Sequence, residues 1–484
     1  MAEYCNRLAK TWSGHRAAEI HRARSLVARV PTVLVGGVVD DSGMGKNNRS
    51  RRAAKRKRQR AEPRRAPDAG PSLPPDADKV AADALSHARW EHHGGVPVGE
   101  CVRPLLALPD STIDRAIDTI FAGLLRGMFA GGWAPIDLYE VSRRRTDAAG
   151  SAFLIDAVAA VTADYPDQLV DPRWLAQLDQ IEGRPWWDRR RPQLGQWAAR
   201  HGQSRYEALT MVMELLGVCD ALPRIEEVLP PPGAAPRVGS VGPIDAAQER
   251  ILAKVRALLA KAESTDFDGE AEALSAKAQE LMSRYALDRA MLDHGRGARQ
   301  RATLCRIWLD NPYVTAKAML VDAVAGANRC RTVLDNRFGS MTVVGDQGDL
   351  RVVELLATSL LLQGARAMLS IGSQQTHRGV SRTRSYRQAF LVAYASRIGE
   401  RLRAANEATV SAIDDSRLLP VLSSRSRAVD ELMEKTFPRL AQKRVSVSNA
   451  AGWGAGTAAA DLALLEVHEA LSDTADGRRS EAAS

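Results

Sequence analysis

Two clusters of basic side chains have the residue types and spacing best suited to binding chemistry. The first lies within fifteen residues and contains no aromatic side chain: Lys46, Arg49, Arg51, Arg52, Lys55, Arg56, Lys57, Arg58 and Arg60. Such a density of charge neutralises phosphate groups and releases their counterions. Because no ring is available for base stacking, this basic arm predicts nucleic-acid contact without sequence preference. The alternative is a solvated tail that improves solubility or contacts anionic surfaces weakly.

The second cluster lies where a loop leads into a predicted helix. It consists of Arg378, Arg382, Arg384 and Arg387. The first turn of a helix offers free amides to anions, and arginine adds two-pronged contacts to phosphate, so this cluster is a second candidate nucleic-acid or phosphate site. Tyr386, Phe390 and Tyr394 repeat every four residues and favour a core face over a stacking platform. The alternative is that the arginines of this cluster and of the helix that follows are solvated or paired with Glu400.

Other patterns that resemble sites are incomplete. His87, His92 and His93 lie near Glu91, but no further ligand set accompanies them, so we predict no metal. The segment 454–459 matches the weak glycine pattern of dinucleotide-binding proteins, yet too few residues follow it. We expect a tight turn into a close-packed alanine helix there, and no cofactor.

No local signature of a catalytic serine or cysteine is present, and no catalytic residue is assigned. The alternative is an enzyme with a pocket in the C-terminal region. In that case His377 with Asp346 and Asp349 is the first place to look.

Composition limits the function classes. The chain has 484 residues, of which 45% are hydrophobic and 26% charged, which excludes fibrous proteins and full-length disorder. The net charge is +9, whereas residues 44–66 hold 11 Lys/Arg and one Glu, so the remainder is close to −1. The basicity therefore belongs to the arm and not to a folded surface. No uninterrupted apolar stretch of membrane-spanning length occurs, and we expect no membrane association. Five cysteines without CxxC spacing favour a reduced, cytoplasmic protein.

Composition shifts divide the chain. We predict a disordered basic arm with a Pro-rich linker at 1–75, a helical domain at 76–229, a Pro/Gly linker at 230–243, a helical hairpin at 244–293, an α+β domain at 300–470 and a disordered tail at 471–484. Met44 precedes the basic arm as a natural start would, which leads to the hypothesis that translation begins there and not at Met1.

Periodicity places the elements inside these domains. Apolar spacings of three and four predict helices at 111–128, 151–165 and 204–222 in the first domain. In the last domain, strands are predicted at 302–309, 331–334 and 341–344, with helices at 313–327, 350–370 and 386–405. This order indicates a small sheet covered by helices. The overall fold class is mixed, with a mainly α first domain, a helical hairpin and a C-terminal α+β domain.

The hairpin resembles a known family. A KxxxLLxxA helix at 254–262, an EAEA start at 270–273 and a KAQxLMxxY helix at 277–285 are similar to the bacterial and phage domain of unknown function 2786. The segments 343–346 and 386–391 resemble the companion domain usually fused to it. The segment 132–139 and the basic start at Met44 resemble actinobacterial members. The family implies no activity and no catalytic residues. Its occurrence in phages mildly favours a nucleic-acid context.

We therefore expect a cytoplasmic, noncatalytic protein that associates with DNA, RNA or a ribonucleoprotein through its basic arm. The hairpin carries a net charge of −3 between Asp245 and Asp293, so it is expected to dock on the α+β domain or on a basic protein partner and not on DNA. The enzyme remains the alternative, and a structural scaffold in a larger assembly is a third. The oligomeric state is not predicted.

Overall fold

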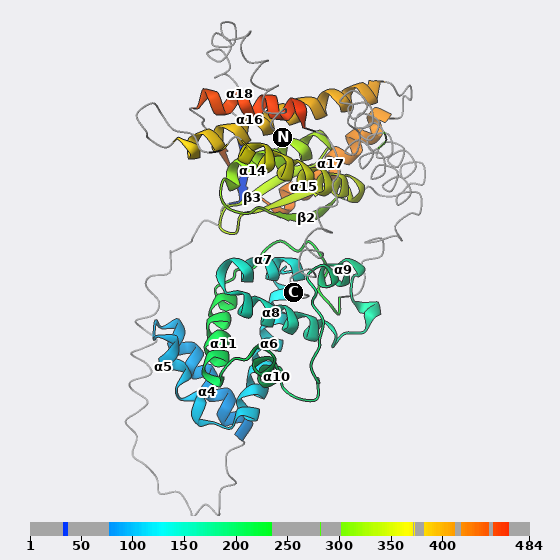
Figure 1. Cartoon of the computed structure of the whole chain (residues 1–484). Helices are drawn as coiled ribbons and strands as arrows, with labels where there is room; N and C mark the ends of the chain where they lie inside the picture. Colours follow the sequence, from blue (N-terminus) through cyan, green and yellow to red (C-terminus); the bar gives the residue numbers. More distant parts are fainter. Residues whose placement is uncertain are drawn as a thin grey trace, which may run out of the picture. The chain divides into compact units, whose positions relative to one another are not determined.

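The protein folds into two compact units. The computed structural model describes residues 32–36, 77–234, 281, 302–370, 372, 382–411, 418–444 and 449–463. One unit, called here the sheet unit, comprises Met1–Gly37 and Val241–Ser484, and the other, the helical unit, comprises Val38–Ser240 (Figure 1). The helical unit is thus inserted within the sheet unit along the chain. The expected fold class, a mainly helical domain with an α+β domain, is confirmed.

In its described residues, the helical unit consists of α-helices and two short 3-10 helices. They are α4 (Ala77–His93), α5 (Val98–Val102), η2 (Leu105–Ala107), α6 (Asp110–Ala130), α7 (Pro135–Arg145), α8 (Ala148–Thr162), η3 (Asp167–Leu169), α9 (Pro172–Gln180), α10 (Gln193–His201) and α11 (Arg205–Asp220). The predicted helices at 111–128, 151–165 and 204–222 correspond to α6, α8 and α11.

Capping side chains set the helix starts that periodicity misses by a few residues. Asp147 accepts a hydrogen bond from the Gly150 amide at 2.7 Å, so α8 begins three residues earlier than predicted. Ser204 and Glu207 form a reciprocal capping box at the start of α11. The helices then bury a shared aromatic centre. Phe153 lies edge-on to Trp197, with ring centroids 5.7 Å apart.

The sheet unit combines a five-stranded sheet with five helices among the described residues. Its elements are β1 (Thr32–Gly36), β2 (Thr303–Trp308), α14 (Val314–Ala327), β3 (Arg331–Asp335), β4 (Ser340–Gly345), α15 (Gln347–Ser370), α16 (Thr383–Ser411), α17 (Leu418–Thr436), β5 (Leu440–Arg444) and α18 (Ala450–Leu462). The strand order is β2-β4-β3-β1-β5. β1 runs parallel to β3, and the other neighbouring pairs are antiparallel.

The first strand corrects a prediction. Residues 32–36 were expected to belong to a disordered arm, yet they form β1, which pairs with β5 at five positions and with β3 on its other side. Because β5 pairs only with β1 in the described sheet, a chain that began at Met44 would leave β5 without a partner strand. A five-residue strand with partners about 300 and 400 residues away has no local signal beyond its own apolar character.

Successive side chains along each strand point to opposite faces of the sheet and join two separate hydrophobic cores. Leu334 and Val343 join the large core formed with α14, α15 and α16. Their neighbours Val333 and Val344 point to the opposite face, where α17 covers them with Val429. The sheet is therefore packed on both faces. α17 and β5 were not predicted from the sequence.

α15 is long and apolar enough to cross a membrane by composition, with a mean hydropathy of 1.4 over its best window. It is the one such helix in the described part of the chain. Val353, Leu356 and Leu360 are fully buried in the large core of the sheet unit, while Leu369 near the end of the helix is exposed. A core helix passes the same composition test, so this helix gives no indication of a membrane segment.

α16 and α18 approach so closely that their contact admits only glycine. A Cβ atom added at Gly456 would lie 2.8 Å from the carbonyl carbon of Phe390, and one added at Gly452 would overlap the carbonyl oxygen of Tyr386. Real Cβ atoms do not come within 3 Å of a backbone atom. The predicted close-packed alanine helix is found as α18, but the tight turn predicted at 454–459 is wrong, because these residues lie inside the helix. Gly452 and Gly456 are the points where the two backbones meet.

We predict that Gly456→Ala destabilises the sheet unit by about 2–3 kcal/mol, because the new methyl group pushes α18 away from α16. Gly454→Ala is the matched control on the same helix, since its Cβ would meet no atom within 4 Å. That change replaces an exposed helical glycine and should leave stability equal or higher by up to about 1 kcal/mol. Thermal unfolding followed by circular dichroism measures both, and equal melting temperatures for the two variants would contradict the close contact.

A second prediction concerns β1. Removing residues 1–43 should lower the melting temperature of the sheet unit by at least about 5 °C, because β3 and β5 both lose a partner strand. Removing residues 1–31 keeps β1 and serves as the control, with an expected change near zero. Differential scanning calorimetry distinguishes the two. The same melting temperature for both truncations would show that β1 adds nothing to the sheet.

Candidate anion-binding surface

The contact between α16 and α18 brings two helix N-termini to one place. The Asn449 side-chain amide donates to the Ser385 hydroxyl at 3.4 Å, next to the first turn of each helix. Further along, Gly456 meets Phe390, and Arg397 pairs with Asp461. Partners therefore advance in the same order on both helices, so the helices run parallel, side by side in the sheet unit (Figure 1).

Parallel helices align their dipoles, which gathers partial positive charge at one end and partial negative charge at the other. The negative end of α18 is compensated within the protein. One guanidinium nitrogen of Arg401 donates to the carbonyls of Ala460 and Ala463, at 2.5 and 2.8 Å. Ala460 lies in the last turn of α18, where its carbonyl also accepts from the Ala463 amide at 3.3 Å, and Ala463 is the residue that follows the helix. One end of the helix pair is thus neutralised by a cation from the neighbouring helix.

The positive end is not compensated in the same way. Neither α16 nor α18 has an acidic residue in its first turn. Instead, Arg382, Arg384 and Arg387 lie at the start of α16, where positive charge is unfavourable for the helix. Arg382 and Arg384 are exposed, and Arg387 is partly buried with its Nε buried and without a hydrogen-bond partner. Asn449 caps α18 by accepting from the Gly452 amide at 2.9 Å.

The three arginines make no ion pair with any residue in the described ranges. By contrast, Arg397 on the same helix binds both Glu400 and Asp461, which matches the expected pairing with Glu400. The arrangement joins two helix N-termini with three guanidinium groups that no described carboxylate neutralises. Such a surface can hold a phosphate or another oxyanion through amides and two-pronged arginine contacts.

Not every residue of the predicted sites falls within the described structure. Arg378, His377 and the basic arm residues Lys46, Arg49, Arg51, Arg52, Lys55, Arg56, Lys57, Arg58 and Arg60 lie outside it. The aromatic residues of α16 are core residues as expected, since Tyr386, Phe390 and Tyr394 are at most 7% exposed. Asn449, which joins the two helix starts, was missed by sequence reasoning because only the parallel packing brings it to Ser385.

The two carboxylates named for the enzyme alternative, Asp346 and Asp349, form a helix cap and a buried ion pair. Asp346 accepts from the Gly348 amide at 2.9 Å and caps α15, while Asp349 is 3% exposed and binds Arg329 at 2.6 Å. Arg425 from α17 approaches Asp346 at 3.7 Å. The space that these side chains enclose is only about 10 Å³, which is at the lower limit for one water molecule. This buried cluster of charged side chains connects α15, the turn before β3 and α17, and it leaves no room for a substrate.

The described thiols are likewise not poised for chemistry. Burial raises the pKa of the Cys219 thiol to about 12 and that of the Cys330 thiol well above its ordinary value. A thiol is a nucleophile only as thiolate, so these groups are inert at neutral pH. Cys101, Cys219, Cys305 and Cys330 are free cysteines, and all but Cys305 are buried.

The histidines considered for a metal each have a separate partner. His87 pairs with Glu91 at 3.3 Å, and His93 pairs with Asp220 at 2.8 Å. Within the described ranges, no three potential ligands of the His, Cys, Asp or Glu type converge.

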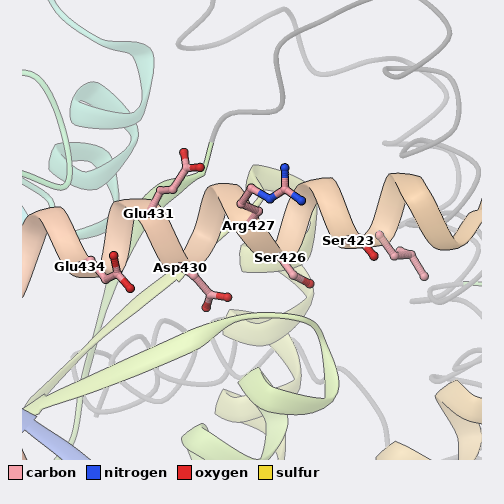
Figure 2. A pocket seen from close by; sticks show the side chains of 7 residues that line it. Ser423, Ser426, Arg427, Asp430, Glu431 and Glu434 are labelled. Carbon is pink, nitrogen blue, oxygen red and sulfur yellow. The ribbon is translucent and has the colours of Figure 1, made fainter.

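A hollow of about 570 Å³ runs along one helix. It is lined by Leu422, Ser423, Ser426, Arg427, Asp430, Glu431 and Glu434, all from α17. Figure 2 shows Arg427 and Glu431 on one side of the helix and Asp430 and Glu434 on the other. Asp430 is already paired with Arg331 at 3.1 Å. Since the polar groups diverge, this hollow does not assemble a site.

Comparison with known proteins identifies one segment. The family model of a protein of unknown function, domain of unknown function 2786, matches residues 250–289. No curated protein and no solved structure matches the chain. Leu281, the one described residue of the matched segment, packs against the large core of the sheet unit. At this residue, the matched segment contacts the α+β domain, which was one of the two docking partners expected for the hairpin.

A prediction tests whether the buried cluster is structural. Asp349→Asn should destabilise the sheet unit by about 3 kcal/mol, because it leaves the Arg329 guanidinium buried without its counter-charge. Asp430→Asn removes the partner of Arg331 from a half-exposed pair and should change stability by less than about 1 kcal/mol. Urea denaturation gives both free energies of unfolding. A small effect of the first change would mean that the Arg329–Asp349 pair is dispensable.

Proposed function

We propose that the protein is a noncatalytic nucleic-acid-binding protein that contacts phosphates with Arg382, Arg384 and Arg387 at the paired starts of α16 and α18. The observation that carries this proposal is the absence of any acidic side chain from both first turns, next to three arginines that form no ion pair with a described residue. Folded proteins normally place carboxylates at this end of a helix. An excess of positive charge here costs stability and is expected where an anion binds.

The neighbouring arginines of the same helix support this assignment. Arg397 and Arg401 are used inside the protein, on Asp461 and on the last carbonyls of α18. Carboxylates and carbonyls of the sheet unit thus bind Arg397 and Arg401. Among the described residues, none of them pairs with the arginines at the start of α16. This difference within one helix is expected if Arg382, Arg384 and Arg387 have a partner outside the chain.

The basic arm fits the same function. It lies between β1 and α4, in the segment that links the sheet unit to the helical unit. Gly36 and Lys46 are ten residues apart, so an extended chain places the first lysine within about 35 Å of the sheet. In this proposal the arm adds salt-sensitive affinity, while the folded surface fixes where the phosphate backbone lies.

Two further parts of the proposal concern the protein's relatives and location. The segments 343–346 and 386–391 lie at the junction of β4 with α15 and on α16, in one unit, as expected for the companion domain of the bacterial and phage family. We assign the chain to the actinobacterial type of that family on the sequence resemblance. Free, buried cysteines fit a reducing cytoplasm.

The proposal is tested by binding of the full-length chain to labelled duplex DNA and RNA between 50 and 200 mM salt, followed by fluorescence anisotropy. The variant Arg382→Gln/Arg384→Gln/Arg387→Gln should bind about 10–100-fold more weakly at low salt and should reduce the salt slope by about 2, because phosphate contacts are lost. The double variant Arg382→Gln/Arg384→Gln changes exposed residues only and should show part of the same effect.

Arg366→Gln and Arg403→Gln are the matched controls. Both arginines are exposed in the sheet unit, and Arg403 lies on α16 about 28 Å from Arg384 along the helix axis. The controls should bind as the unmodified chain does. Equal salt slopes for the triple variant and the controls would sink the assignment to this surface. A chain whose arm residues are changed to Gln then reports how much affinity the arm supplies.

A further inference from the structure

The loop between α9 and α10 carries a second cluster of functional residue types, which the sequence analysis did not single out. It contains Trp186 and Trp187 among arginines: Arg184, Arg189, Arg190 and Arg191. With Arg200 on α10, the segment 184–200 has five arginines and one aspartate, a net charge of +4. Unlike the basic arm, this segment combines positive charge with rings.

These tryptophans differ from those in the core of the same unit. Trp133, Trp174 and Trp197 are at most 1% exposed, whereas Trp186 is 36% exposed and Trp187 is partly exposed. The rings of Trp186 and Trp187 are nearly perpendicular, with centroids 5.7 Å apart. Large rings left at the surface beside one another mark a binding surface more often than a folding requirement.

The loop is held in place by hydrogen bonds. The Gln196 side chain donates to the carbonyls of Asp188, Arg191 and Pro192 at 3.0–3.2 Å, and its oxygen accepts from the Asp188 amide at 3.1 Å. The Trp186 indole donates to Asp156 at 2.7 Å. The rings are therefore positioned before any partner arrives, which reduces the entropy lost on binding.

Contacts within the protein engage Trp186, Arg184, Arg189 and Arg200. The Arg200 guanidinium lies 4.2 Å from the centroid of Trp186 and occupies one face of that ring. Trp187 makes no other aromatic or cation–π contact with a described residue. Arg184 and Arg189 form exposed pairs with Asp179 and Asp164.

Arg190 and Arg191 are exposed, and neither forms an ion pair within the described structure. They lie three and four residues beyond Trp187. This loop therefore carries the partly exposed Trp187 ring, which contacts Trp186, and two exposed guanidinium groups that form no ion pair with a described residue.

We propose that this loop binds an unpaired nucleic-acid strand, with a base stacked on Trp187 and phosphates on Arg190 and Arg191. The inference rests on the proposed function and specifies its substrate as a strand with accessible bases. Stacking requires unpaired bases, because a duplex hides their faces, and any base offers a ring face. Arg190 and Arg191, which are exposed and form no ion pair with a described residue, favour a polyanion over an apolar protein partner.

The test uses the full-length chain and a single-stranded oligonucleotide that contains 2-aminopurine, whose fluorescence falls when it stacks on a ring. Trp187→Ala should weaken single-strand binding about 5–50-fold, abolish the quenching and leave duplex binding unchanged. Trp187→Phe keeps a ring and should restore most of both signals. Arg190→Gln/Arg191→Gln should lower affinity and reduce the salt slope by about 1–2.

Trp90→Ala is the matched control, because Trp90 is 71% exposed in the same unit and lies outside this loop. It should bind as the unmodified chain does. Single-strand binding and quenching by Trp187→Ala equal to those of the control would overturn the inference and assign the loop to another class of partner.

The two proposals fail separately. If the variant of Arg382, Arg384 and Arg387 binds normally while Trp187→Ala loses single-strand binding, the loop inference stands and the helix-start assignment falls. If the opposite pattern is found, the loop inference falls alone. Absence of binding to any nucleic acid by the unmodified chain removes both.

Discussion

The close contact between α16 and α18 is the constraint on which the sheet unit depends. Glycine at 452 and 456 lets the two backbones meet, and this contact fixes both the spacing and the parallel direction of the helices. α16 in turn contributes Phe390, Tyr394 and neighbouring residues to the large core against α14, α15 and the sheet. One added methyl group at the contact would therefore also disturb the packing of the large core against the sheet.

The same contact explains the charge pattern of the unit. Parallel packing concentrates opposite partial charges at the two ends of the helix pair. At one end Arg401 neutralises the last carbonyls of α18, so that end is satisfied within the fold. At the other end the chain places Arg382, Arg384 and Arg387 and no carboxylate in either first turn. The asymmetry follows from the parallel packing and from the residue types at the two helix starts together.

Sequence reasoning was accurate where the signal is local. Apolar spacing predicted α6, α8, α11, α14, α15 and α16, and the strands β2, β3 and β4, with errors of a few residues at their ends. It missed β1 and β5, because their only partners are each other and β3, hundreds of residues away. For the candidate surface, residue types identified Arg382, Arg384 and Arg387. Only the structure showed that two helix starts meet beside them, and the rings of Trp186 and Trp187 were overlooked although their arginine-rich setting is visible in the sequence.

The position of β1 has a consequence for synthesis of the chain. Val35 pairs with Leu334, and Leu34 pairs with Gln442, so the strand made first needs partners made about 300 and 400 residues later. At about 5–20 residues per second, β1 leaves the ribosome some 20–80 s before β5 exists. The inserted helical unit, which ends at Ser240, is made long before that moment. A nascent chain of this protein therefore carries a complete helical unit and an unpaired β1 at once, and the sheet can form in full only after β5 has been made.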